Sequence, residues 1–385
     1  MQKTFQQKPH YDILDGLRGV AALIVILYHV FECFDWSPAP RGYLAVDFFF
    51  VLSGFVIGYA YDDRWGRGLK TGGFFRRRLI RLHPMVVLGA LVGAVCFLLQ
   101  GGRMWDGTPV ATSLVMLALL LNMLMLPLPV GAAADIRGNG EMFPLNGPVW
   151  SLFFEYIGNV LYALLLRRMP TRWLCAVAVV TGGLLGYVAL SDGYLGVGWS
   201  MADGGFWTGL VRMLFPYTLG MLMARRIGRH PAREDERPSQ VVVFAGASLV
   251  LVLAAVAPFL FGEMPAWCGG LYDALCVALV FPAVVWCTAR LCPAHGGRQA
   301  DSGRRGTRLI RFLGDLSYPL YAVHYPLMYL FYAHIGFAGE LVPIAKVHDV
   351  WPVALALPFG CILLGWIALR CYDLPVRRWL ARVWE

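Results

Sequence analysis

Two ionisable residues stand in the first long apolar stretch of the chain, where a bilayer would reject them. Arg18 lies near the start of residues 14–34 and His29 near the middle. Placing such groups at bilayer depth costs roughly 3 kcal/mol or more, so their presence predicts a functional site. Eleven residues bring a helix back to nearly the same direction, which puts Arg18 and His29 on one face about 16 Å apart. We expect that face to look into protein or water.

The composition places these residues in a membrane protein. Of 385 residues, 58% are hydrophobic and only 15% are charged, a balance far from that of soluble domains. The net charge of +9 falls in short clusters beside apolar stretches, which indicates membrane topology and not nucleic-acid binding. The nine cysteines form no C-x-x-C pair and no metal-ligand spacing, so neither a disulfide framework nor a metal site is predicted.

The elements that would hold such a site are transmembrane helices. We expect an all-α, polytopic bundle that forms a single membrane domain over residues 1–385, with no appended soluble domain. Apolar stretches long enough to cross a bilayer lie at residues 17–34, 43–61, 84–100, 110–128, 149–166, 173–190, 206–224, 240–261, 268–290, 312–334 and 350–371.

The basic clusters test this set of spans, because arginine and lysine gather on the cytoplasmic side. If every stretch crossed, the clusters after residue 166 would lie outside; removing one crossing between Arg81 and Arg167 places all of them inside. We therefore predict about ten spans, cytoplasmic termini, a location in the cytoplasmic (inner) membrane, and one re-entrant or non-spanning segment within 84–166. The clusters are Lys3/Lys8 and residues 64–81, 167–172, 225–237, 290–311 and 377–382.

Five ordered segments resemble acyltransferase family 3, integral membrane O-acyltransferases that act on carbohydrates and related acceptors. The segment LDGLRGVAALIVILYHV at 14–30 is similar to the opening span of that family, in which an Arg-Gly pair is followed eleven residues after the Arg by an essential His. Ala45, His83 and Asp373 depart from the family pattern, which bears on subfamily more than on class. The other segments are VDFFFVLSGFVIG at 46–58, FFRRRLIRLHP at 74–84, VWSLFFE at 149–155 and LGDLSYPLYAVHYPL at 313–327.

The resemblance implies transfer of an acyl group, most simply acetyl, from a cytoplasmic acyl-CoA to a hydroxyl of a carbohydrate, glycolipid or similar acceptor. The acyl-CoA would be a co-substrate and not a tightly bound cofactor. Such transfer needs a group that takes the hydroxyl proton, and an imidazole with an ordinary pKa near 6.5 suits this role. His29 is the expected base or, alternatively, a nucleophile that carries the acyl group; a purely structural histidine is the other interpretation.

Glu155 is the second catalytic candidate, because a carboxylate inside an apolar segment requires a partner. Arg18, His29 and His324 are the partners that the sequence offers. Arg18 itself either orients the substrate or forms an ion pair with Asp15 or Asp47.

Arg78 and Arg81 are the expected donor-binding residues, since guanidinium groups three residues apart on one helix face match the phosphates of coenzyme A. The competing interpretation is a positive-inside signal, which we retain for Arg76 and Arg77. The other candidates for substrate or donor binding are Asp47, Ser53, Trp150, Ser151, Tyr318, Tyr321 and His324.

Several of these candidates also have a structural interpretation. Asp47 would be interfacial at the outer end of its span, and Ser53 with Gly54 would be a small-residue contact between helices. Tyr318 and Tyr321 would belong to an interfacial aromatic belt. A rival function for the whole chain is a transporter or exporter in which buried Arg, His and Glu form a proton or substrate path.

Overall fold

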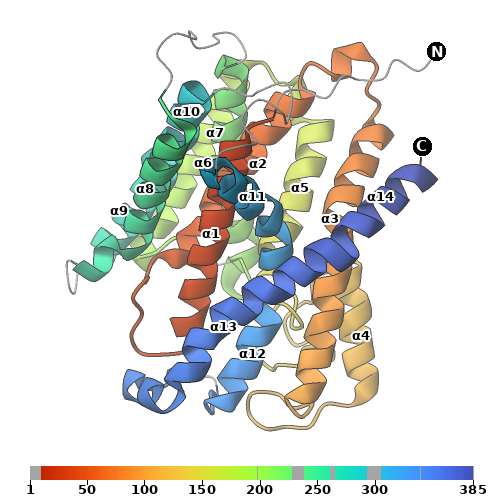
Figure 1. The fold of residues 1–385 in the computed structure, drawn as a ribbon, viewed down its shortest axis with the longest axis vertical. Helices are drawn as coiled ribbons and strands as arrows, with labels where there is room; N and C mark the ends of the chain where they lie inside the picture. Colours follow the sequence, from red (N-terminus) through yellow and green to blue (C-terminus); the bar gives the residue numbers. More distant parts are fainter. Residues whose placement is uncertain are drawn as a thin grey trace.

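A computed structural model describes residues 10–196, 198–227, 238–260, 265–292, 305–338 and 340–384. Within these residues the chain is helical, and extended backbone pairs only in isolated bridges. The predicted all-α, polytopic membrane fold is confirmed (Figure 1). The α-helices are α1 (Asp12–Phe31), α2 (Ala45–Tyr61), α3 (Thr71–Leu99), α4 (Thr112–Met123), α5 (Val149–Leu164), α6 (Thr171–Asp192), α7 (Gly205–Ile227), α8 (Gln240–Leu260), α9 (Ala266–Leu275), α10 (Phe281–Leu291), α11 (Arg305–Val323), α12 (Tyr325–His334), α13 (Val347–Ile367) and α14 (Leu374–Val383).

The membrane spans follow the apolar stretches of the sequence. Among the described residues, 8 helical stretches are long and apolar enough to cross a membrane. They contain α1, α2, α3, α5, α6, α8, the pair α9 and α10, and the pair α13 and α14. The predicted spans at 206–224 and 312–334 are helical as well, but α7 carries Arg212 and the second stretch is interrupted at His324.

The helix too short to span a bilayer is α4. It has 12 residues, a length of about 18 Å against the roughly 30 Å of a bilayer core. The chain then continues to Val149 without a regular α-helix, through a region rich in proline, glycine and asparagine that disfavours one. Of the three candidate segments within 84–166, the structure therefore selects 110–128.

The basic residues of several helices meet at one end of the bundle, which we call the basic end. Arg225 of α7 contacts Asp62 after α2 and the backbone of Arg167 and Met169 after α5. Arg311 at the start of α11 pairs with Asp12 at the start of α1. In Figure 1, α14 also ends on this side.

This arrangement agrees with one crossing fewer than the apolar stretches suggest. It rests on the described basic residues alone, because the Lys3/Lys8 cluster, the later part of 225–237 and most of 290–311 lie outside the described residues.

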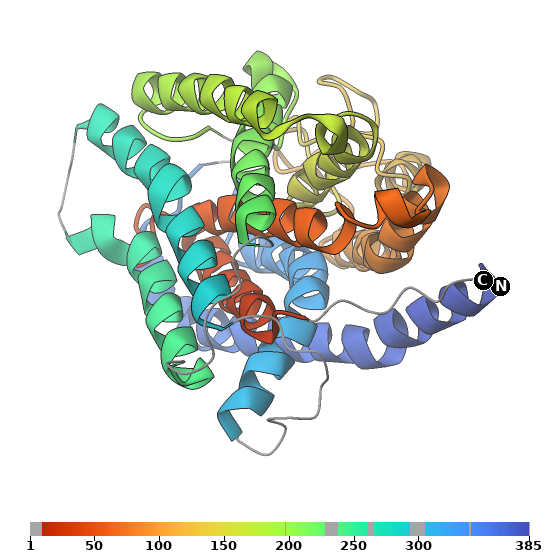
Figure 2. The ribbon, with the colours of Figure 1, turned by 90° about the horizontal axis from the view of Figure 1, so that it is seen from above.

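The helices that carry candidate site residues lie inside the bundle. In 18-residue segments of the membrane-spanning stretches that contain α1 and α2, 61% and 67% of the residues are buried. In those that contain α6 and α8, only 28% and 22% are buried. Figure 2 shows α1 and α2 surrounded by the others. Glycines permit this packing: a Cβ at Gly54 of α2 would lie 1.9 Å from the Tyr217 carbonyl oxygen of α7, and one at Gly19 of α1 would lie 2.4 Å from the Leu313 carbonyl oxygen of α11. The predicted small-residue contact at Gly54 is confirmed.

Candidate active site

His29 lies in the last turn of α1 and not near the middle of the first span, as the sequence had suggested. The helix begins at Asp12 and ends at Phe31, so His29 is about 26 Å along it from the basic end. The error arose because the predicted span began later than the helix does. Arg18 and His29 are eleven residues apart on α1, so their side chains lie near opposite ends of the helix.

A carboxylate holds the His29 ring. Glu32 Oε2 lies 2.7 Å from His29 Nδ1, and the two side chains are 14% and 20% exposed for His29 and Glu32. Glu32 Oε1 accepts a hydrogen bond from the hydroxyl of Tyr325 of α12 at 2.7 Å, and the hydroxyl of Tyr332 shares its proton between this oxygen, also at 2.7 Å, and the His29 carbonyl oxygen. Donors on both carboxylate oxygens favour the ionised form. Because that carboxylate accepts, Nδ1 of His29 donates, and in the neutral form of the ring this leaves the lone pair on Nε2.

His324 lies beside His29, in the break between α11 and α12. Pro326, in the first turn of α12, lacks the N–H that a continuous helix would use. The His324 side chain is fully buried, and its ring centroid is 5.4 Å from that of His29. Its Nδ1 lies 2.8 Å from the Tyr321 carbonyl oxygen. The two histidines, which come from the first and the penultimate predicted spans, therefore form one site.

A small pocket with about 30 Å³ of space for water-sized molecules lies on the basic side of these histidines. Tyr321 and Ser151 stand at one end of it, and their hydroxyls are 2.7 Å apart. The Tyr321 ring is 5.6 Å from that of His324, so Tyr321 lies against both the pocket and His324. The lining residues are Arg18, Val46, Phe49, Phe50, Ser151, Leu152, Glu155, Ser317, Tyr318 and Tyr321.

Glu155 lies in the wall of this pocket with a partner that the sequence analysis did not name for it. Arg78 Nη2 and Ser53 Oγ each donate to Glu155 Oε1 at 2.7 Å. The expected partners Arg18, His29 and His324 are therefore wrong. Opposite charges in a buried site attract strongly. Arg78 lies about 10 Å along α3 from the start of that helix, which is at the basic end.

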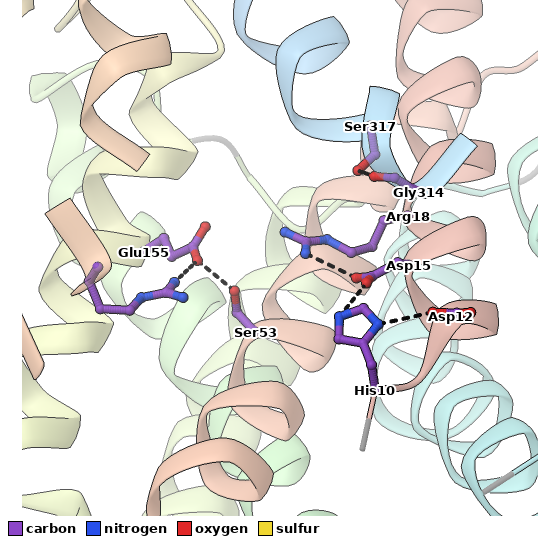
Figure 3. A network of polar contacts seen from close by, with 9 residues as sticks. His10, Asp12, Asp15, Arg18, Ser53, Glu155, Gly314 and Ser317 are labelled. Carbon is purple, nitrogen blue, oxygen red and sulfur yellow. Dashed lines mark hydrogen bonds and ion pairs between the residues drawn. The ribbon is translucent and has the colours of Figure 1, made fainter. Parts of the chain in front are cut away.

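Arg18 faces the same space from α1. Its Nη1 lies 3.5 Å from Asp15 Oδ1, so of the two expected ion-pair partners Asp15 is correct and Asp47 is wrong. In Figure 3 the Arg18 guanidinium extends away from α1 toward Glu155 and Ser53. Arg81 is close enough to Arg18 and Arg78 for their like charges to repel. Among the described residues, Arg18 lines the pocket itself and Arg78 reaches its wall through the ion pair with Glu155.

Tyr318 contacts α3, not the membrane interface. Its hydroxyl donates to the Leu82 carbonyl oxygen at 2.5 Å, and Tyr321 is 5% exposed. The aromatic-belt interpretation is therefore wrong for both tyrosines, since a belt requires side chains at the lipid surface.

Asp47 belongs to a separate buried network. Arg212 of α7 donates to both of its carboxylate oxygens, at 2.9 and 2.7 Å, and both side chains are fully buried. Arg212 also donates to the Gly196 and Tyr43 carbonyl oxygens, and its guanidinium lies 5.5 Å from the Trp150 ring centroid. The interfacial interpretation of Asp47 is wrong. Neither Asp47 nor Trp150 lines the pocket.

Two important residues escaped the sequence analysis. Glu32 stands three residues after His29, a spacing that faces the same side of a helix, but its place at the end of an apolar stretch resembled an ordinary boundary. Arg212 interrupts the apolar stretch 206–224, and that interruption was a usable signal of a buried partner.

The acyltransferase domain of the family Acyl_transf_3 matches residues 11–370, nearly the whole chain. This chain belongs to acyltransferase family 3. The match spans every element of the site, from Arg18 in α1 to His324 after α11. It agrees with the resemblance of the five sequence segments, and it favours a membrane acyltransferase over the transporter interpretation.

Other members and relatives point to the same class. The chain is 26% identical to the acyltransferase MdmB of Streptomyces mycarofaciens, with 96% of this chain and 92% of that protein aligned. It is 25% identical to a putative membrane-bound transacylase, BcsY, of Komagataeibacter xylinus, over 85% of this chain and 75% of that one. A putative O-acetyltransferase of Staphylococcus aureus is 42% identical over 23% of this chain and 14% of its own length. No solved structure matches the chain.

Proposed function

We propose that this family 3 acyltransferase moves an acyl group, most simply acetyl, from a cytoplasmic acyl-CoA to a hydroxyl of a carbohydrate, glycolipid or similar membrane-delivered acceptor. The observation that carries the proposal is the His29–Glu32 pair beside His324, whose ring contacts Tyr321, a residue that lines the pocket together with Arg18. The basic end would face the cytoplasm of a cell with this protein in its inner membrane, as the positive-inside rule implies.

In the proposed reaction His29 Nε2 takes the proton of the acceptor hydroxyl. The hydroxyl oxygen forms a bond to the thioester carbonyl carbon, the C–S bond breaks, and the departing thiolate receives the proton from the imidazolium. Glu32 holds the required tautomer and stabilises the positive ring, a function that carboxylates serve in other His-dependent acyl transfers. Glu32 thus takes the catalytic place that the sequence had suggested for Glu155.

A second route keeps the same residues but forms an acyl-enzyme. His29 Nε2 would attack the thioester, release coenzyme A, and pass the acyl group to the hydroxyl in a second step. Rapid-quench mass spectrometry of the protein with acyl-CoA alone separates the routes, because only this one leaves an acyl mass on the peptide containing His29.

The donor would enter at the basic end. Arg18 and Arg81 would bind the phosphates of coenzyme A, and the acyl end of the thioester would enter the small pocket lined by Phe49 and Leu152, which would have to widen to admit it. Arg78 shares this role only in part, because its guanidinium already pairs with Glu155. Ser53 supports that ion pair, while Ser151 with Tyr321 closes the far end of the pocket.

The test uses purified protein in detergent with radiolabelled acetyl-CoA and a panel of sugar and polyol acceptors. We expect slow thioester hydrolysis or transfer that His29→Ala lowers by about 100-fold or more, the usual contribution of a general base. Arg18→Met should raise the KM for acetyl-CoA. His334→Ala, at the exposed end of α12, is the matched control and should retain activity. Gradient-driven solute flux without use of the thioester would contradict the proposal.

A further inference from the structure

The two histidines of the site present the same nitrogen to a ligand. His29 Nδ1 faces a carboxylate oxygen of Glu32 and His324 Nδ1 faces the carbonyl oxygen of Tyr321. Both oxygens accept, so each Nδ1 donates, and in a neutral imidazole the proton on Nδ1 leaves Nε2 as an acceptor. The site therefore holds two acceptor nitrogens on rings whose centroids are 5.4 Å apart and whose planes are tilted by 31°.

His324 Nε2 has no hydrogen-bond partner among the described residues, although its side chain is fully buried. Buried polar atoms in proteins are nearly always paired, and an exception calls for an explanation. The neighbouring hydroxyls are already engaged: that of Tyr321 with Ser151 and Pro148, and that of Tyr325 with Glu32. None of these hydroxyls donates to His324 Nε2, and a hydroxyl of a bound acceptor would supply that hydrogen bond.

One hydroxyl cannot serve both nitrogens, because it carries a single proton. In the proposed function His29 Nε2 takes the proton of the hydroxyl that reacts. We propose that His324 Nε2 accepts a hydrogen bond from a second hydroxyl of the same acceptor, on the carbon next to the reacting one, so that this enzyme selects acceptors with vicinal hydroxyls. This inference rests on the proposed function and assigns its acceptor class.

The selectivity follows from the cost of an unpaired group. A site built to hydrogen-bond a substrate hydroxyl rejects the analogue that lacks it, because the buried partner stays unpaired. A bound diol donates a hydrogen bond to His324 Nε2, whereas a matched mono-alcohol leaves that nitrogen without a hydrogen-bond partner.

The experiment compares kcat/KM for acetyl transfer to 1,2-propanediol and 1-propanol, and to methyl glucoside and its monodeoxy analogues. For the wild type we expect the diol of each pair to be favoured by about tenfold, the effect of one hydrogen bond in a buried site. His324→Phe, which removes the acceptor atom, should bring the ratio near one, because it lowers transfer to the diol more than transfer to the mono-alcohol. His324→Gln, whose amide oxygen accepts, should restore part of the preference. His334→Phe is the control.

Two results would overturn the inference. A wild type without preference for the diol would do so, and so would a His324→Phe variant that loses both acceptors equally, because that pattern belongs to a proton relay between the two rings or to a structural role. The failure of the proposed function looks different: acetyl-CoA would be hydrolysed or ignored with no transfer to any alcohol, in the wild type as in the variants.

Discussion

At the scale of single residues, Glu32 determines which nitrogen of His29 can act as the base. A histidine near the end of a helix is a base of uncertain tautomer until its second nitrogen is fixed. Here Glu32, one turn further along the chain, fixes it at 2.7 Å and is itself held by two tyrosine hydroxyls of α12. The pair thus joins the first helix to the penultimate span, so the base is positioned by tertiary structure.

Replacing Glu32 by glutamine tests this role. The amide can offer its NH₂ to Nδ1, which then accepts, so that Nε2 becomes protonated and loses its lone pair. We expect Glu32→Gln to lower kcat by about 100-fold or more with a smaller change in the KM for acyl-CoA, as measured by thioester turnover. Tyr332→Phe, which removes one donor and keeps the carboxylate, should cost much less. Equal losses in the two variants would show that Glu32 acts only through packing.

At the scale of elements, buried ion pairs connect helices that are far apart in the sequence. Asp47 of α2 and Arg212 of α7 are 165 residues apart, and Glu155 of α5 and Arg78 of α3 are 77 apart. A single sequence can show that each charge needs a partner, but it cannot show which one, because partner choice depends on how the helices pack. That is why Arg78 was expected at the phosphates and Glu155 beside a histidine.

The Asp47–Arg212 pair should stabilise the contact between α2 and α7. Asp47→Asn would leave a fully buried guanidinium without its counter-charge, a change that typically costs about 3–5 kcal/mol. We expect a large fall in the melting temperature in detergent. Asp62→Asn removes the charged partner of Arg225 where the side chains are 25% and 17% exposed, and should cost less than Asp47→Asn because water can partly solvate the remaining guanidinium. Asp47→Leu with Arg212→Met should recover part of the loss.

The start of α1 carries a pH-dependent contact. His10 hydrogen-bonds Asp12 and lies 2.9 Å from Asp15; these bonds, Asp12 first, raise the pKa of His10 from 6.5 to about 9. A raised pKa means that the contribution to stability is complete below about pH 6.5 and is lost as the pH rises through about 9. The difference in melting temperature between the wild type and His10→Gln should therefore shrink between pH 7 and pH 10. A constant difference would show that the His10 charge does not contribute.

At the scale of the whole molecule, hydropathy and charge predicted most of the architecture. The apolar stretches located the helices, because a bilayer demands long segments with satisfied backbone groups. They did not set helix ends: α1 begins at Asp12, five residues before the predicted span, since Asp12 is paired with Arg311. Nor did they show that α4 stops after 12 residues, because its apolar stretch continues to Leu128 in non-helical backbone.

The topology depends on α4 not crossing the membrane, and labelling with a membrane-impermeant maleimide tests it. If α4 fails to span, α3 and α5 are the two crossings between the turn after α2 and the segment after α5. Gly66→Cys and Arg168→Cys should then react from the same side, and Asp106→Cys, between α3 and α4, from the other. The unsubstituted protein gives the background from its own cysteines. Were Arg168→Cys to react together with Asp106→Cys, the chain would cross once more than the bundle allows. The basic residues that follow α5, such as Arg168 and Arg225, would then lie on the opposite side of the membrane from Asp62, although Arg225 contacts Asp62 in the structure.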